Sequence, residues 1–378
     1  MRVICFAILI TLIAGGGVGC GSGVVREQTV IAPGAVYSHI ITDDPFDVHV
    51  LEIDLKVRSL KIEVFRTRGL VRTSDLVTAA EHHDGQRVIA GINGDFFSFK
   101  TGWPLGNQVT DGKFVLGTQS IRSHFLIDEQ GRPGFDRLSF VGCFRTVRDD
   151  VIRIGGVNRR FGGDTVSFLT SSWYDSSTTN IGTTGILLRR TDPEWVVDDT
   201  MIMVCVSRDW SGGISDNEGL LKVEEREGGK SVLDGIAAGD TVRLFLGFES
   251  HRKRIRQVIG GAGRILKNGE FTVMEDARLE RLGRSFLDAR HPRTFVGFDK
   301  DTTKLFLCAV DGRQKSSLGM TFKEMGELLL SIGAWNGVNL DGGGSTTFVV
   351  EKRVLNSPSD KAGERPVANA VVVEEARK

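Results

Sequence analysis

Short apolar runs separated by glycine are the feature that most constrains the fold of this chain. Glycine accounts for 47 of the 378 residues, and 40% of the residues are hydrophobic, which is enough for a substantial core. In segments 49–55 and 60–65, apolar and polar residues alternate with a period of two, as is typical of half-buried antiparallel strands. Glycine-rich connections between short runs favour strands and turns over long helices. We therefore predict an α+β fold of strand-rich mixed sheets with a few packing helices.

The same patterns predict the remaining elements. Further strands are expected at 88–92, 166–170, 186–190, 201–207, 241–248, 294–298, 304–310 and 337–340. Helices are expected at 74–83, after a cap at Thr73 or Ser74, at 276–286, and at 322–332. The last of these helices is preceded by a capping-box pattern, Thr321 with Glu324. Glu324 therefore has a structural role and is not a catalytic candidate.

The C-terminal third predicts a βαβ unit, formed by the strand 304–310, the helix 322–332 and the strand 337–340. Asp311 and Asp341 directly follow the two strands. Side chains at the carboxyl ends of parallel strands commonly line a crevice. We therefore expect these two carboxylates at the same edge of a sheet.

The N-terminus is typical of an export signal. An apolar run at 3–14, too short to span a bilayer as a helix, is followed by small residues that lead to Cys20. This resembles a bacterial lipoprotein cleavage site with lipidation at Cys20, although Gly17 stands where leucine is usual. We predict a signal peptide at 1–20 and a membrane-anchored lipoprotein of the cell envelope. The alternative is soluble export to the periplasm or the medium.

The length suggests about two domains of ~150 residues each. We expect residues 21–28 to be a polar tether. Residues 29–143 and 250–378 are predicted to form a central catalytic core, and 144–249 an inserted β-rich subdomain with short strands between Gly, Asp and Ser. The charged run Glu224–Glu227 is interpreted as a solvated turn flank.

Charge and cysteine content exclude several classes of protein. Lys+Arg and Asp+Glu both number 48, so no global basic field indicates a nucleic-acid partner. Outside the leader and Cys20, the cysteines are Cys143, Cys205 and Cys308. The last two lie in apolar, strand-like runs and are predicted to be buried thiols rather than parts of a disulfide framework. No CxxC or HExxH pattern occurs, so a closed zinc site is not expected.

Two polar clusters are candidate ligand-binding segments, one rich in arginine and one with a polar pair beside aromatic residues. In Arg290-His291-Pro292-Arg293, two guanidinium groups offer planar forks for phosphate or carboxylate oxygens, and the proline restricts the backbone. The alternative is a surface salt-bridge patch. In the segment 93–97, NGDFF, a polar pair stands beside two aromatic residues that can wall a sugar or base site. The alternative there is a type I′ hairpin turn.

A glycine-rich loop, DGGGSTT at 341–347, forms a third cluster, and Asp311-Gly312-Arg313-Gln314 a fourth. The glycines allow backbone N–H groups to approach an anion closely. The loop is not a P-loop, because the GK[ST] ending is absent and a strand follows. It is not a nucleophile elbow either, which makes Ser345 a poor candidate for an acyl-enzyme nucleophile. The alternative is a strand connection in which Asp341 caps its own turn.

Nine motifs occur in an order that resembles the phosphodiester glycosidase family over about residues 33–373. They are NGDFF (93–97), GGAG (260–263), LKNG (266–269), RHPRTFVGFD (290–299), VDGRQ (310–314), GMTF (319–322), NLDGGGSTT (339–347), NSPSD (356–360) and ERPVAN (364–369). The resemblance implies an exported bacterial hydrolase that cleaves the bond between a sugar's anomeric carbon and a phosphodiester of the N-acetylglucosamine-1-phosphodiester type. It would release free sugar and a phosphomonoester. The expected substrate is an envelope, capsular or environmental glycan phosphodiester.

The resemblance also implies a set of site residues. Expected as catalytic are Asp341, as base or nucleophile, Asp95 as second choice, and His291 as a donor to phosphate. Expected as substrate-binding are Asn93, Arg290, Arg293, Asp311, Arg313, Gly342, Gly343, Gly344, Ser345 and Thr346. The chemistry agrees, because an acidic phosphomonoester leaving group needs charge neutralisation more than a general acid. An oxocarbenium-like transition state needs a carboxylate.

Two alternatives stay open from the residues themselves. In a metal-assisted phosphodiesterase, Asp95, Asp311 and Asp341 would hold Ca²⁺ or Mg²⁺ through oxygen ligands. In a non-catalytic envelope lipoprotein, the same arginines and glycine loop would bind anionic glycans. No cofactor is required by the sequence, and the identity of any metal stays open.

Overall fold

The computed structural model describes residues 24–159, 161, 165–173, 185–223, 233–249 and 253–376. The predicted signal peptide, Cys20 and the charged run Glu224–Glu227 lie outside the described residues. The chain packs as two compact units. Unit 1 contains the residues up to Trp103 together with 131–135 and 261–378, and unit 2 contains 104–130 and 136–260. The predicted subdomain 144–249 lies within unit 2.

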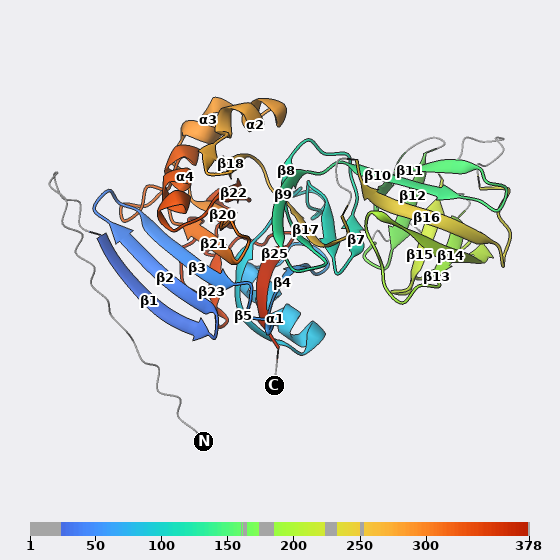
Figure 1. Cartoon of the computed structure of the whole chain (residues 1–378), viewed down its shortest axis with the longest axis horizontal. Helices are drawn as coiled ribbons and strands as arrows, with labels where there is room; N and C mark the ends of the chain where they lie inside the picture. Colours follow the sequence, from blue (N-terminus) through green and yellow to red (C-terminus); the bar gives the residue numbers. More distant parts are fainter. Residues whose placement is uncertain are drawn as a thin grey trace, which may run out of the picture. The chain divides into compact units, whose positions relative to one another are not determined.

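An eight-stranded sheet of unit 1 has the order β1-β2-β3-β21-β20-β22-β18-β19 (Figure 1). Its strands are β1 (Val24–Ala32), β2 (Ala35–Thr42), β3 (Asp47–Asp54), β18 (Arg264–Lys267), β19 (Glu270–Phe271), β20 (Arg293–Phe298), β21 (Lys304–Val310) and β22 (Asn336–Asn339). The expectation of a tether up to residue 28 is wrong for 24–28. Val24 already pairs with Thr42, and the backbone of this segment is satisfied by β2.

The predicted βαβ unit is confirmed, with one strand inserted in it. β20 pairs antiparallel with both β21 and β22, so β21 and β22 are parallel and separated by β20. The helix α4 (Phe322–Ser331) connects them. The capping box at its N-terminus forms as predicted: Thr321 Oγ1 accepts from the Glu324 amide at 3.2 Å, and Glu324 Oε2 accepts from the Thr321 amide at 2.8 Å.

A second sheet of unit 1 has the order β24-β23-β5-β25-β4. Its strands are β4 (Leu60–Phe65), β5 (Arg87–Asn93), β23 (Phe348–Val350), β24 (Arg353–Val354) and β25 (Ala370–Glu375). Helix α1 (Thr73–Asp84) packs against it, and an added Cβ at Gly91 would lie only 2.6 Å from Val77 Cγ2. Glycine at this position therefore lets the helix approach the sheet closely.

Two helix predictions need correction. Neither Thr73 nor Ser74 caps α1; its N-cap is Arg72 without a side-chain cap, and the Glu364 carboxylate accepts from the Ser74 amide at 3.0 Å instead. The expected helix 276–286 is two helices, α2 (Val273–Leu279) and α3 (Arg284–Asp288). Arg281 has a φ of 57°, a left-handed conformation that interrupts a right-handed helix.

Unit 2 is built around a closed barrel in the order β10-β11-β12-β15-β13-β14-β16, drawn in green and yellow in Figure 1. Its strands are β10 (Phe140–Arg145), β11 (Val151–Val157), β12 (Val166–Thr170), β13 (Gly185–Arg190), β14 (Asp199–Arg208), β15 (Glu218–Lys222) and β16 (Thr241–Phe248). The strands β6 (Gln108–Thr110), β7 (Lys113–Leu116), β8 (Ser123–Asp128) and β17 (Ile255–Gly260) form a five-stranded sheet with β9 (Pro133–Arg137).

The buried thiols are confirmed. Cys205 and Cys308 are buried, Cys143 is partly exposed, and none of these three forms a disulfide. In the part of the chain that the structure describes, no helix has the length and apolar character needed to cross a membrane.

Candidate active site

Three of the predicted motifs meet at one edge of the eight-stranded sheet. Asp311 follows β21, and Asp341 follows the parallel strand β22 after one residue. Arg293 begins the antiparallel strand β20 and pairs with Val310, so it lies at the same edge. The expectation that the two strand ends bring Asp311 and Asp341 to one edge is confirmed.

Asn93 connects this edge to the second sheet. It ends β5 and is fully buried. Its Nδ2 donates to the Asp341 carbonyl at 2.7 Å, while its Oδ1 accepts from Thr294 Oγ1 at 2.6 Å and from the Thr347 amide at 3.1 Å. All of these groups are buried or half-buried, so Asn93 holds the start and the end of the glycine loop against β20.

The alternative of a hairpin turn at residues 93–95 is wrong. β5 pairs with β23 and β25, not with the strand that follows it in sequence. The Gly94 amide donates to the Asn369 carbonyl at 3.0 Å, and the Asp95 amide donates to Asn369 Oδ1 at 2.8 Å. The segment after Asn93 is therefore anchored to the chain just before β25.

Asp341 is half-buried at the start of the glycine loop. Its amide donates to the Gly94 carbonyl at 2.9 Å, and its Oδ1 accepts from the Gly342 amide at 2.9 Å. The carboxylate therefore caps its own turn, as the alternative for this loop proposed. The same turn keeps part of Asp341 accessible to solvent.

The glycine amides have partners within the protein. The Gly342 amide donates to Asp341, and the Gly343 amide donates to the Pro292 carbonyl at 2.8 Å. The expectation that these two N–H groups are free to bind phosphate is therefore wrong for this structure. The loop continues as a short 3-10 helix at Gly343–Ser345, in which Gly343 has a φ of 63°.

The second half of the loop is covered. An added Cβ at Gly344 would lie 2.1 Å from Asp360 Oδ1 and 2.2 Å from Arg365 Nη2, so only glycine fits against this ion pair. Ser345 and Thr346 are buried, and neither hydroxyl has a hydrogen-bond partner among the described residues. Substrate contacts by Gly344, Ser345 and Thr346 stay predictions from the motif.

Glycines surround the His291-Pro292 segment. An added Cβ atom at Gly312 would lie 2.7 Å from the Pro292 nitrogen, and one at Gly342 would lie 2.7 Å from the Pro292 carbonyl oxygen. At Gly319 the added atom would lie 2.2 Å from the His291 carbonyl oxygen. The RHPR, DGR and DGGG motifs are therefore in direct backbone contact. Partial burial, followed by the charges of Arg293 and Arg313, lowers the pKa of His291, which favours the neutral imidazole.

The two arginines of the RHPR motif have partners within the protein. Arg293 is buried, and its Nε and Nη2 donate to the carbonyls of Met320, Phe286 and Ala289 at 2.7–2.9 Å. Burial lowers its pKa to about 10, so it still carries a positive charge at neutral pH. Arg290 is half-exposed, and its Nε donates to Glu324 Oε1 at 3.0 Å.

Arg313 has no such partner. It is exposed, and its guanidinium Nη2 would lie 3.1 Å from a Cβ added at Gly343, so it extends over the glycine loop. Among the described residues it forms no hydrogen bond or ion pair, in contrast to Arg290 and Arg293. Arg313 is therefore the arginine of the predicted set that is best placed to receive an anionic ligand.

The carboxylates of Asp311 and Asp95 are both buried. Asp311 accepts from Asn356 Nδ2 at 2.9 Å and from the Ser357 amide at 2.8 Å. Burial raises its pKa against the effect of these hydrogen bonds. Asp311 therefore anchors the NSPSD segment, and Asp341 is the half-exposed carboxylate among the three predicted ones.

Comparisons with known proteins indicate a family for part of the chain. Residues 198–374 match the profile of the phosphodiester glycosidase family, and this span contains the RHPR, DGR and DGGG motifs. Over that span, the chain is similar to the phosphodiester glycosidase family.

Curated relatives share short segments with this chain. The SPbeta prophage-derived uncharacterized protein YomE of Bacillus subtilis (strain 168) is 40% identical over 87 residues, which are 23% of this chain and 13% of that protein. The N-acetylglucosamine-1-phosphodiester alpha-N-acetylglucosaminidase of Mus musculus is 32% identical over 134 residues, which are 32% of this chain and 26% of that protein. The matched segments thus span about a quarter or less of these relatives.

A solved structure supports the fold. A protein of Burkholderia pseudomallei K96243 superposes with a TM-score of 0.69 at 16% identity, covering 98% of this chain and 100% of that one. At this identity the likeness shows the fold alone.

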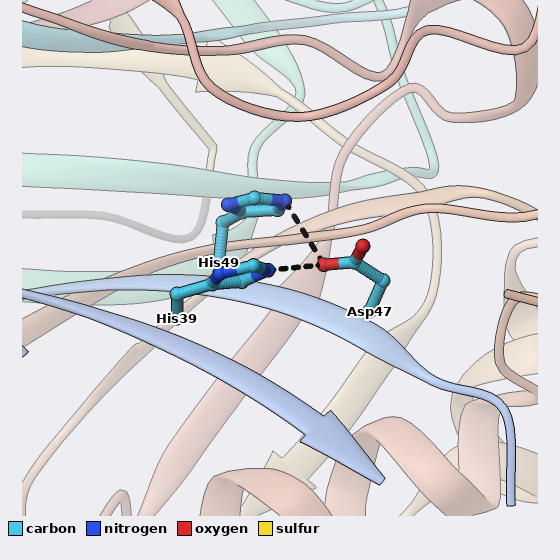
Figure 2. Close-up of side chains that lie close together, drawn as sticks. All are labelled: His39, Asp47 and His49. Atoms are coloured by element: carbon cyan, nitrogen blue, oxygen red, sulfur yellow. Dashed lines mark hydrogen bonds and ion pairs between the residues drawn. The ribbon is translucent and has the colours of Figure 1, made fainter. Parts of the chain in front are cut away.

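The metal-binding alternative for the phosphodiester glycosidase motifs finds no support in side-chain positions. Within the described residues, Asp95, Asp311 and Asp341 do not form a group of three close ligand atoms, whereas His39, Asp47 and His49 do. The ligand atoms of these last three residues lie within 4.8 Å of one another (Figure 2).

Sequence reasoning missed this second cluster. The alternation in 49–55 predicted a half-buried strand, and it did not indicate that the polar residue His49 is buried. Phe348 of β23 and Tyr37 of β2 both lie against it, with ring centroids 5.9 and 6.1 Å away. The spacing Asp47-x-His49 was the available signal, and it carries no information without the strand register.

Proposed function

We propose that this protein is an exported hydrolase that cleaves the bond between a sugar's anomeric carbon and a phosphodiester. The substrate class is the N-acetylglucosamine-1-phosphodiester type, after which the mouse relative is named. The observation that carries the proposal is a half-exposed carboxylate, Asp341, which Asn93 fixes at a sheet edge. The glycine loop that follows Asp341 contacts the Pro292 backbone and lies against Arg313. The similarity of residues 198–374 to the phosphodiester glycosidase family supports a hydrolase.

In the proposed reaction, the C–O bond between the anomeric carbon and the phosphate oxygen breaks, and water supplies the new hydroxyl of the sugar. Asp341 stabilises or attacks the oxocarbenium-like carbon, or activates the water. The phosphate leaves with its electron pair as a phosphomonoester. Its charge is met by the Arg313 guanidinium, which has no competing carboxylate among the described residues.

His291 has a supporting role in this proposal. Its lowered pKa keeps it neutral near pH 7, so one ring nitrogen carries a hydrogen and can donate to a phosphate oxygen. Buried Arg293 adds a fixed positive charge behind it, held by three carbonyls. Arg290 is better explained as the partner of Glu324 at the start of α4.

The test is Asp341→Asn, assayed on a panel of anomeric sugar phosphodiesters with product identification. We expect kcat to fall by about 10²–10⁴-fold, the typical contribution of a positioned acid or base. A matched control is Asp301→Asn, an exposed carboxyl in the turn before β21. Thermal unfolding should be similar in both variants. Near-normal kcat in Asp341→Asn would exclude the proposed role.

The products separate this proposal from its rivals. Free sugar with a phosphomonoester supports the glycosidase, whereas sugar 1-phosphate would indicate cleavage of a P–O bond. Binding of glycan phosphodiesters without release of any product across the panel would indicate the non-catalytic lipoprotein.

We further propose that the protein acts at the cell envelope, anchored through Cys20, since the apolar run 3–14 and the small residues before Cys20 are typical of an export signal. A Cys20→Ser variant should move from the membrane fraction to the soluble fraction. Equal membrane retention of both forms would contradict lipidation.

A further inference from the structure

Strand register places two histidines and an aspartate on one face of β2 and β3. His39 directly faces His49 across the antiparallel pair, and Asp47 faces Ile41. Residues two apart on a strand project to the same face, so Asp47 and His49 lie side by side. Cross-strand neighbours in such a pair are close enough for their side chains to interact. The three side chains therefore converge through regular backbone structure.

The side-chain geometry agrees with the register (Figure 2). His39 Nε2 lies 2.6 Å from Asp47 Oδ1, and His49 Nε2 lies 3.4 Å from the same oxygen. The two imidazole rings are stacked, with centroids 4.8 Å apart and an interplanar angle of 10°. Three potential ligand atoms thus point toward one small region.

The surroundings of His49 favour a ligand role over a simple hydrogen bond. Its Nδ1 lies 2.7 Å from the Tyr37 hydroxyl. Its buried Nε2 makes no well-oriented hydrogen bond among the described residues, although it lies at ion-pair distance from Asp47. Metal-binding histidines commonly use the other ring nitrogen to contact such an orienting group. His39 and Asp47 are 28% and 24% exposed, so an ion has access from solvent.

We propose that His39, Asp47 and His49 form a binding site for a divalent transition-metal ion such as Zn²⁺. Two imidazoles and one carboxylate are a ligand set that suits zinc and its neighbours, whereas Ca²⁺ and Mg²⁺ prefer oxygen ligands alone. Three protein ligands leave a further coordination position for water or an anion.

The distances require only a small adjustment. Ligand atoms about 2.05 Å from a tetrahedral ion are about 3.4 Å apart. The separation of His49 and Asp47, 3.4 Å, already fits this geometry. The partly exposed ring of His39 would have to move away from Asp47 by under about 1 Å. Its ligand atom would also have to lie about 3.4 Å from that of His49, and all three ligand atoms are within 4.8 Å of one another.

This site is separate from the proposed catalytic carboxylate but shares its sheet edge. The Asp311 amide donates to the Asp47 carbonyl at 3.0 Å, and Ser317 Oγ contacts both segments. The inference does not rest on the proposed glycosidase activity, and its test needs no substrate.

The experiment is metal titration of the chelator-treated full chain. Zn²⁺ binding is followed by calorimetry, and Co²⁺ binding by its visible absorption. Variants His39→Ala and Asp47→Asn are compared with His82→Ala, a control at an exposed histidine of α1. We expect one ion per chain, affinity at least about 100-fold lower in the two site variants, and an unchanged control.

Two results would overturn the proposal. One is the absence of stoichiometric binding of Zn²⁺ and Co²⁺ to the unaltered chain. The other is unaltered affinity in His39→Ala, whose partly exposed ring can be removed with little effect on the core. If Asp47→Asn fails to fold, His39→Ala decides the outcome alone.

Discussion

At the scale of single residues, the candidate site depends on which polar groups already have partners. The sequence motifs predict the same substrate-binding role for Arg290, Arg293 and Arg313, but the environments of their side chains differ. Arg293 is held by three carbonyls and Arg290 by a carboxylate, while Arg313 lies over Gly343 without a partner among the described residues. A free guanidinium can pair with a ligand without first breaking an existing interaction.

This difference predicts unequal effects of truncation. Arg313→Ala should lower kcat/KM on anomeric phosphodiesters by about 10- to 100-fold, because hydrogen bonds to charged groups contribute about 1.5–3 kcal/mol. Arg290→Ala should change kcat/KM little and unfolding free energy by less than about 1 kcal/mol, since it breaks a half-exposed ion pair. Steady-state kinetics and thermal melts of both variants are the measurements. A larger kinetic loss in Arg290→Ala would reverse the assignment.

The motifs predicted the location of the site more accurately than the role of each residue in it. Asp311 and Asp341 are at one edge because the strand ends were visible in the sequence. The partners of Arg290 and Arg293 could not be predicted from the sequence, because Glu324 and Met320 lie 34 and 27 residues further along the chain. Asn93 was expected to contact substrate, and its buried side chain instead binds the loop that carries Asp341.

At the scale of elements, local patterns predicted strand positions well. The bounds of β4, β12, β16 and β21 agree with the prediction, because short apolar runs between turn residues define these strands on both sides. The prediction failed where tertiary contacts decide. The break between α2 and α3 depends on the conformation of Arg281, and β3 is covered on its polar face by a strand nearly 300 residues away.

A buried histidine in β8 predicts that the stability of the protein depends on pH. His124 in β8 is completely buried, and its Nε2 accepts from the Asn107 amide at 3.0 Å. Burial lowers the pKa of His124 from its ordinary value of 6.5 to about 4, so the folded state resists protonation. Stability is therefore full above pH 6.5 and is lost as pH falls toward 4, with about 2 kcal/mol lost by pH 5.

The free energy of unfolding of unit 2, measured with denaturant at several pH values between 7 and 5, gives the slope of stability against pH. A His124→Gln variant is less stable at pH 7 but should lack this contribution to the pH dependence. An equal slope in the variant and the unaltered protein would assign the effect to other groups.

At the scale of the whole molecule, the two units have separate hydrophobic cores. One core cluster lies within the barrel and neighbouring strands of unit 2, and two others lie within unit 1. Each unit also contains a buried thiol, Cys205 in unit 2 and Cys308 in unit 1. Burial raises the pKa of both thiols, which disfavours the reactive thiolate.

These thiols predict how the molecule unfolds. Iodoacetamide should label neither Cys205 nor Cys308 in the native protein, while the partly exposed Cys143 reacts faster and serves as the internal control. We expect labelling at increasing denaturant concentration, measured by peptide mass spectrometry, to follow the unfolding transition of the unit that contains each thiol. The reason is that a buried thiol becomes accessible to the reagent only when the core around it unfolds. Labelling of native Cys308 at the rate of Cys143 would contradict the packing of β21. A single shared transition would instead show that neither core survives loss of the other.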